Sequence, residues 1–176
     1  MVNAALRKVM LVLLVAGLVP ARLTQDAYAG VYEDGLDAYK SGNYPKALTL
    51  WRRLAALGHA DAQFQLGYMY ARGKGAPHDE IESAMWYFYA AEQGDLYSQV
   101  HLGLYYQQGE GLPEELVQAY KWFGLAAKGA KAASDREVWQ DASGLQRDTA
   151  TRLSKEQIEE GERLIRAWRP KSDAGR

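Results

Sequence analysis

The feature that most constrains this chain is a ten-residue stretch that occurs twice. Residues 66–75 read LGYMYARGKG, and residues 102–111 read LGLYYQQGEG, 36 positions later. Other identities keep the same offset: Gly58 and Gly94, Gln63 and Gln99, Pro77 and Pro113, Trp86 and Trp122, Ala90-Ala91 and Ala126-Ala127. A fixed period between about 20 and 50 residues is typical of a solenoid, in which each unit buries its apolar face by stacking on a neighbour.

Each unit is predicted to be a pair of antiparallel helices. In the first helix Ala62, Leu66 and Tyr70 recur about once per turn and share an apolar stripe. Glycine within a helix costs about 1 kcal/mol relative to alanine, and this is tolerated where two backbones approach closely. We therefore expect Gly67 and Gly103 to lie at helix–helix contacts.

The ends of the helices are also marked. Gly73 and Gly75 are expected to end the first helix, because glycine readily adopts positive φ. The second helix carries Ala84 and Tyr87 on one stripe and is expected to stop at Gly94.

This pattern resembles the Sel-one-like repeat, a 36-residue relative of the tetratricopeptide repeat. The resemblance rests on Leu-Gly-x-x-Tyr, Gly-x-Gly, proline, tryptophan, Ala-Ala and a closing glycine, and two units match, at residues 58–94 and 95–129. It implies an all-α fold: a right-handed α-solenoid of antiparallel helix pairs. Ser98 and Tyr120 replace the usual alanines, so the second unit is expected to pack somewhat differently.

The flanking segments match the repeat only loosely. Residues 30–57 are predicted to form an atypical N-terminal helix pair, residues 130–170 helices that cap the stack, and residues 171–176 a flexible tail. Ser154 and Gln157 have the spacing of a capping box before the last helix. Members of the Sel-one-like family often close with a similar segment, here Arg147-Asp148, Leu153-Ser154 and Trp168.

Residues 1–29 have the layout of a secretory signal peptide, with cleavage after Ala21 or Ala29. Two basic residues precede an apolar run over residues 9–19, which is shorter than the roughly 20 residues that span a bilayer. The alternative is an uncleaved anchor, because Arg22 and Asp26 give the exit region more charge than usual. We expect a periplasmic or secreted protein that contacts the membrane only if this segment is kept.

Composition narrows the classes of partner. The chain has no cysteine, so disulfides cannot support the core. Its 21 basic and 22 acidic residues give a formal net charge of −1, which offers no electrostatic footprint for nucleic acid.

The sequence shows no catalytic, cofactor or metal motif. His59, His78 and His101 lack the i, i+4 spacing of a helical metal pair. The run at residues 78–80 places acidic side chains at a predicted helix start, where they favour the positive end of the helix dipole. We expect no enzyme activity, no cofactor and no metal.

The aromatic run at residues 86–89 admits two interpretations. Four consecutive rings cannot share one face of a helix, because each position turns by about 100°. Some of these rings belong either to the interface with the next unit or to an exposed binding surface.

Two classes of function remain open. The favoured one is an exported scaffold that presents a concave groove to a protein or peptide and mediates complex assembly, as the resemblance implies. The alternative is a cell-wall-associated or β-lactam-binding hydrolase, as described for cysteine-rich members of the family, although this chain lacks those cysteines.

The predicted groove residues are first-helix positions outside the repeat pattern. They are Gln65, Met69 and Arg72, with their equivalents 36 residues later, His101, Tyr105 and Gln108. This mixture of a cation, an imidazole, amides and adaptable apolar groups suits a peptide or an extended loop.

Overall fold

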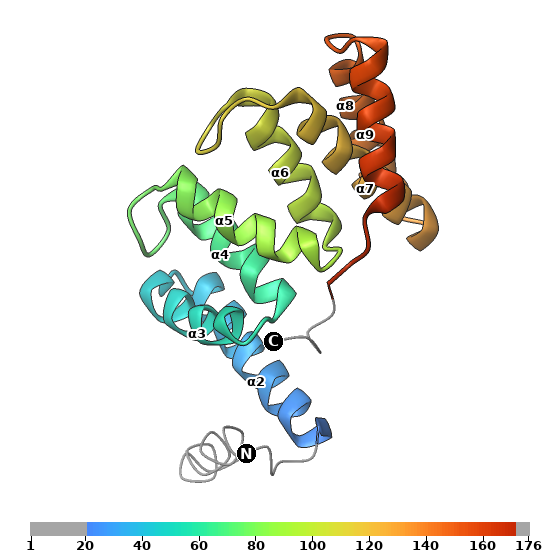
Figure 1. The fold of residues 1–176 in the computed structure, drawn as a ribbon. Helices are drawn as coiled ribbons and strands as arrows, with labels where there is room; N and C mark the ends of the chain where they lie inside the picture. The colour runs from blue at the N-terminus through green and yellow to red at the C-terminus, as the bar shows by residue number, and fades with distance from the viewer. Residues whose placement is uncertain (1–20, 172–176) are drawn as a thin grey trace.

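The computed structural model describes residues 21–171, and their regular structure is entirely helical, as predicted. The helices are α2 (Ala21–Lys40), α3 (Tyr44–Ala56), α4 (Ala60–Arg72), α5 (Glu80–Glu92), α6 (Leu96–Gln108), α7 (Leu116–Ala133), α8 (Arg136–Ala150) and α9 (Lys155–Ala167). From α2 to α8 each helix packs against the next one along the chain (Figure 1). This succession of paired helices is an α-solenoid. The first helices of its units are α2, α4 and α6, and the second helices are α3, α5 and α7.

Glycines set the close approach within each pair, as the sequence predicted. A Cβ atom added at Gly67 would lie 2.7 Å from Cδ1 of Tyr87, and one at Gly103 would lie 2.5 Å from Cε1 of Phe123. Both rings are buried. The glycines therefore let an aromatic ring of the second helix lie directly on the backbone of the first.

The two regular units end their first helices in the same way. Gly73 (φ 60°) follows α4 and Gly109 (φ 73°) follows α6, both in the left-handed conformation. The second helix α5 then starts at Asp79, whose carboxylate accepts hydrogen bonds from the amides of Ile81 and Glu82, 3.0 Å each. The acidic run at residues 78–80 thus has a structural role at a helix start.

Buried glutamines join successive units. The Gln63 Nε2 group donates to the carbonyl of Ala55, and Gln99 Nε2 donates to the carbonyl of Ala91, each at 3.1 Å. In both cases the acceptor lies at the end of the preceding second helix. The 36-residue identity of these glutamines therefore reflects a repeated tie between units.

The first helix begins earlier than the sequence suggested. Most of the predicted signal peptide, residues 1–20, lies outside the described residues, but α2 already starts at Ala21 and contains Ala29. Tyr28 packs against the core formed by α3 and α4. Cleavage after Ala29 would cut α2 and remove this contact, whereas cleavage after Ala21 would leave the helix whole.

The third pair extends beyond its predicted boundary. α7 continues through Gly129 to Ala133, and Ser134 (φ 61°) takes the left-handed position that ends it. Gly129 instead serves packing, because a Cβ atom there would lie 2.5 Å from Cδ2 of Leu96. The glycine that was read as a helix end is therefore a contact between α6 and α7.

The two C-terminal helices both pack on α7, as Figure 1 shows beside the last repeat. On the α9 side, the Tyr120 hydroxyl donates to the Glu162 carboxylate at 2.8 Å. The predicted capping box is present, with the Ser154 side chain accepting from the Gln157 amide and the Gln157 side chain accepting from the Ser154 amide.

Residues 168–171, here called the C-terminal strap, return to the second unit. The Trp168 indole donates to the Glu92 carboxylate (Nε1–Oε1 3.4 Å), and the Lys171 amide donates to the Glu92 carbonyl at 2.8 Å. The Lys171 ammonium forms an ion pair with the same carboxylate. Lys171, expected in a flexible tail, is therefore bonded to α5, and residues 172–176 lie outside the described residues.

Candidate partner-binding face

Aromatic side chains connect the first helices of neighbouring units. Tyr39 of α2 meets Tyr68 of α4 with ring centroids 6.4 Å apart. Phe64 of α4 lies 6.1 Å from Tyr97 and 6.2 Å from His101, both of α6. All these rings are only partly buried except Tyr97, which is 53% exposed. We call this surface, made by α2, α4 and α6, the first-helix face.

A second set of contacts lies where α2 meets the start of α4. The rings of Tyr32 and His59 are stacked, with centroids 5.4 Å apart and planes 15° from parallel. The Gln65 side chain donates to the Tyr32 hydroxyl at 3.1 Å. His59 also caps α4, since its Nδ1 atom accepts from the amide of Ala62. The polar atoms here are engaged and hold the rings in place.

Arg72 of α4 and His101 of α6 are polar residues of the first-helix face that each contact a tyrosine ring. The Arg72 guanidinium lies 5.6 Å from the ring centroid of Tyr68, within cation–π range. His101 stacks on buried Tyr87, with centroids 4.6 Å apart and planes 10° from parallel. Burial, and secondarily the charge of Arg72, lower the pKa of His101. The imidazole is therefore neutral at pH 7, and Arg72 supplies the positive charge at this point.

Acidic groups lie at the other end of the same helices. Asp95 caps α6 by accepting from the Ser98 amide at 2.7 Å. Burial raises the pKa of Asp95, and the neighbouring charge of Asp61 adds to the rise. These positions are ordinary for helix ends, where acidic groups face the N-terminus and Arg72 faces the C-terminus.

Four of the six predicted groove residues reach the surface. Gln65 and His101 are half-buried, and Arg72 and Gln108 are exposed. Arg72 lies over the Tyr68 ring and His101 stacks on Tyr87, and the charge of Arg72 contributes to the lowered pKa of His101. Gln65 is bonded to Tyr32, and Gln108 lies at the exposed end of α6.

The other two predicted residues are buried. Met69 is 0% exposed and belongs to the core between α3 and α4. Tyr105 is 9% exposed, and its hydroxyl donates to the Ser83 Oγ atom at 2.9 Å. The prediction that Met69 and Tyr105 line an accessible groove is therefore wrong. α4 is packed by α3 and α5, and α6 is packed by α5 and α7, so positions outside the repeat pattern are not all free.

Sequence reasoning missed the aromatic side chains that the first-helix face exposes. Phe64 and Tyr68 share one stripe of α4 at i, i+4 spacing, which was a readable signal. Their equivalents 36 residues later are Val100 and Leu104, and Tyr97 corresponds to Asp61. Because these rings do not follow the repeat, a search along the repeat did not find them.

Metal-binding clusters and membrane-spanning helices are two other features that the described residues lack. Within residues 21–171, no group of three or more histidines and carboxylates lies close enough to hold a metal ion. None of the helices in that range is long and apolar enough to cross a membrane. The face instead offers aromatic rings, the exposed Arg72 cation and amides, which are groups typical of protein contacts.

Fold and face together define a helical-repeat scaffold for protein interaction. The family model of the Sel1 repeat matches three consecutive segments, residues 25–59, 60–95 and 96–130. The chain belongs to the Sel1 repeat family. The first matched segment contains the helix pair that the sequence analysis set apart as atypical. Sel1 repeats are typically non-catalytic and generally bind proteins.

Two curated relatives share 34% identity with this chain over 64 residues. Both are described as an exopolysaccharide production negative regulator, one from Rhizobium meliloti (strain 1021) and one from Rhizobium leguminosarum bv. viciae. The match covers 36% of this chain and 24% of each relative. The chain thus matches about a quarter of the length of these proteins.

Solved structures with the same fold confirm the solenoid. A protective antigen of uropathogenic Escherichia coli, described as displaying an SLR fold, is 30% identical and superposes with a TM-score of 0.69 over 81% of this chain and 30% of its own. A Sel1 repeat protein from Oxalobacter formigenes is 27% identical, with a TM-score of 0.55 over 72% of this chain and 57% of its own.

Proposed function

We propose that this protein is exported and that its first-helix face holds an extended segment of a partner protein, so that the solenoid acts as an assembly scaffold or adaptor. The observation that carries the proposal is the set of partly exposed rings across α2, α4 and α6, with the Arg72 cation beside Tyr68. Aromatic and arginine side chains dominate the binding energy of protein interfaces. Rings held by stacking also lose little conformational freedom when a partner binds.

The extended form of the partner follows from the geometry of a repeat surface. Each unit contributes one first helix, so rings on α2, α4 and α6 lie on successive units of the stack and suit a ligand that contacts several units. Helix surfaces present side chains rather than free backbone groups, because their amides and carbonyls are already paired. Recognition would therefore depend on the ligand's side chains, especially apolar and aromatic ones.

Export rests on the predicted signal peptide and is compatible with α2. Cleavage after Ala21 would leave an N-terminus at Arg22 and keep the Tyr28 packing contact. N-terminal sequencing of the mature protein measures this directly. The curated relatives named as negative regulators of exopolysaccharide production suggest that the partner takes part in regulating exopolysaccharide production.

Capture of the partner tests the binding face. We propose to crosslink the tagged protein in its exporting compartment and to compare Tyr68→Ala combined with Arg72→Glu against Arg53→Glu. Arg53 is an exposed cation on the second helix α3. We expect the double variant to lose the captured partner while still unfolding cooperatively, at a lower temperature because the Tyr68 ring packs against the cluster that contains Tyr87, and the control to retain the partner. Retention by the double variant, with loss in the control, would move the site to the second helices.

A further inference from the structure

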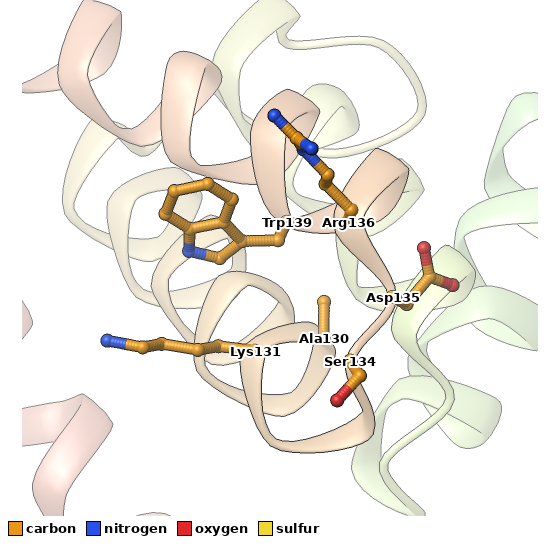
Figure 2. Close-up of a pocket in the computed structure, with 6 residues that line it drawn as sticks. All are labelled: Ala130, Lys131, Ser134, Asp135, Arg136 and Trp139. Carbon is orange, nitrogen blue, oxygen red and sulfur yellow. The ribbon is translucent and has the colours of Figure 1, made fainter.

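A recess lies where α7 turns into α8, away from the first-helix face. It has a volume of about 220 Å³ and is lined by Ala130, Lys131, Ser134, Asp135, Arg136 and Trp139. In Figure 2 the Trp139 indole lies between the Lys131 and Arg136 side chains, and Asp135 and Ser134 lie on the opposite side of the recess. Trp139 is 39% exposed, so much of a large apolar ring faces solvent here.

The charged side chains around the Trp139 ring differ in whether they already have a hydrogen-bond partner. The side chains of Lys131 and Arg136 are exposed and make no hydrogen bond or ion pair within residues 21–171. The carboxylate of Asp135, by contrast, caps α8 by accepting from the Val138 amide at 3.1 Å. The recess therefore offers two free cations and one indole, while its only acid is held by the backbone.

We propose that this recess binds one carboxylated sugar ring, a hexuronate unit of an acidic polysaccharide. The apolar C–H face of the sugar stacks on the indole of Trp139, whose π face carries negative potential. The sugar carboxylate pairs with Arg136, whose guanidinium can donate two parallel hydrogen bonds to it, and Lys131, on the other side of the indole (Figure 2), donates to a sugar hydroxyl. The Ser134 hydroxyl, on the rim of the recess, donates to or accepts from a sugar hydroxyl.

The shape of the recess favours a sugar over an aromatic acid. An aromatic ring gains most of its affinity when an apolar pocket encloses most of its surface, and such pockets measure about 300–1,000 Å³. A recess of about 220 Å³ with a half-exposed floor covers only one face of a single ring. A sugar has one apolar face to bury and a rim of hydroxyls that must stay hydrated, so partial cover suits it. An open recess also lets the rest of a polymer leave on either side.

Titration with defined oligosaccharides tests this site in the full chain. The probes are a trimer of galacturonic acid, the matched neutral trimer of galactose, and a glutamate oligomer with the same charge as the acid trimer. Binding is followed by calorimetry and by the NMR signal of the Trp139 indole N–H. We expect the galacturonic acid trimer to bind and to shift this signal, and both other probes to bind at least about tenfold more weakly.

Two variants decide whether the recess carries the binding. Lys131→Ala combined with Arg136→Ala should weaken the acid trimer about tenfold, whereas Lys128→Ala, an exposed lysine on α7 outside the recess, should not. Trp139→Ala should abolish the binding, with its melting curve recorded to confirm folding. The proposal is overturned if the acid trimer does not bind, if the neutral trimer or the glutamate oligomer binds equally well, or if the recess variants bind as the wild type does. Variants of the first-helix face should leave this binding unchanged, so the two sites are tested independently.

Discussion

At the scale of single residues, helix glycines separate into those that pack and those that do not. Gly67 faces the buried ring of Tyr87, and a Cβ atom there would lie 2.7 Å from Cδ1. A Cβ atom added at Gly144 in α8 would have no heavy atom of another residue within 4 Å outside its own helix backbone. Helix propensity favours alanine at both sites by about 1 kcal/mol, so only the contact can make the two substitutions differ in sign.

We therefore expect Gly67→Ala to lower the free energy of unfolding by about 1–3 kcal/mol and Gly144→Ala to raise it by up to about 1 kcal/mol. The buried Tyr87 ring cannot move aside without losing its own packing. Chemical denaturation measures both variants against wild type. If both variants were more stable than the wild type, the Tyr87 ring could shift away from the added methyl group without loss of packing energy.

The half-buried imidazole of His101 predicts a pH dependence. Its pKa is lowered, so the unfolded chain takes up a proton before the folded protein does as the pH falls. The His101 contribution to stability is thus complete above about pH 6.5 and decreases as the pH falls from there to the folded pKa. Arg72 is the charge that acts on it from α4, while the raised pKa of Asp95 has the opposite sign and acts at lower pH.

His101→Phe isolates this effect because it keeps a ring against Tyr87 but cannot titrate. Between about pH 7.5 and about pH 5.5, the wild type should lose more stability than the variant. Thermal melts at both pH values give the comparison. An equal loss in the two proteins would contradict a depressed pKa at this position.

At the scale of helices and their pairs, the buried glutamines show why the two regular units are not equivalent. The Oε1 atom of Gln63 accepts from Gln93 Nε2 at 2.7 Å, but Oε1 of Gln99 is buried with no partner among the described residues. The position equivalent to Gln93 in the next unit is Gly129. The same glycine that admits Leu96 also removes the donor that Gln99 would use.

Replacement of each glutamine by methionine should reveal this difference. Gln63→Met removes two hydrogen bonds and should destabilise by about 1–3 kcal/mol, whereas Gln99→Met also removes an unpaired buried oxygen and should cost less. Exposed Gln108→Met is the control, expected within about 0.5 kcal/mol of wild type. Denaturation curves rank the three variants, and a larger cost at Gln99 would contradict the hydrogen-bond account.

The sequence predicted much at this scale because the repeat encodes local rules. Periodic apolar stripes, the packing glycines and the capping box at Ser154 follow from helix geometry alone, and the structure confirms them. The site was harder to predict because exposure depends on neighbours. Met69 and Arg72 lie one turn apart on α4, yet one is buried against α3 and the other faces solvent.

At the scale of the whole molecule, the C-terminal strap adds a long-range contact to a fold built from neighbouring ones. Repeat units ordinarily contact only adjacent units. The strap connects the end of α9 to Glu92 at the end of α5, 76 residues away along the chain. Glu92 is an acid in the last turn of a helix, which the helix dipole disfavours, and its side chain is only 13% exposed. The contacts of Glu92 with Trp168 and Lys171 explain why an acidic residue occupies this position.

Glu92→Lys should therefore release the strap while leaving α5 intact. The new lysine loses the contacts of Glu92 with Trp168 and Lys171 and repels Lys171 and Lys121, so the strap should open while the helices stay folded. Hydrogen exchange at the Lys171 amide should become about tenfold faster. Glu137→Lys, at an exposed position on α8, is the charge-matched control and should leave this amide protected. Unchanged exchange in Glu92→Lys would show that the ion pair does not hold the strap.

The central claim is that partners bind on the first-helix face, and site-specific photocrosslinking in the exporting compartment tests it most directly. A photoreactive phenylalanine analogue would replace Tyr68 or Tyr97 on that face, or Ile81, an exposed apolar residue on the second helix α5. Mass spectrometry then identifies the crosslinked peptide. We expect the analogue at position 68 or 97 to crosslink to the same segment of one partner protein, and the analogue at position 81 to give no such crosslink. Crosslinks to a shared partner from position 81, with none from position 68 or 97, would contradict the claim.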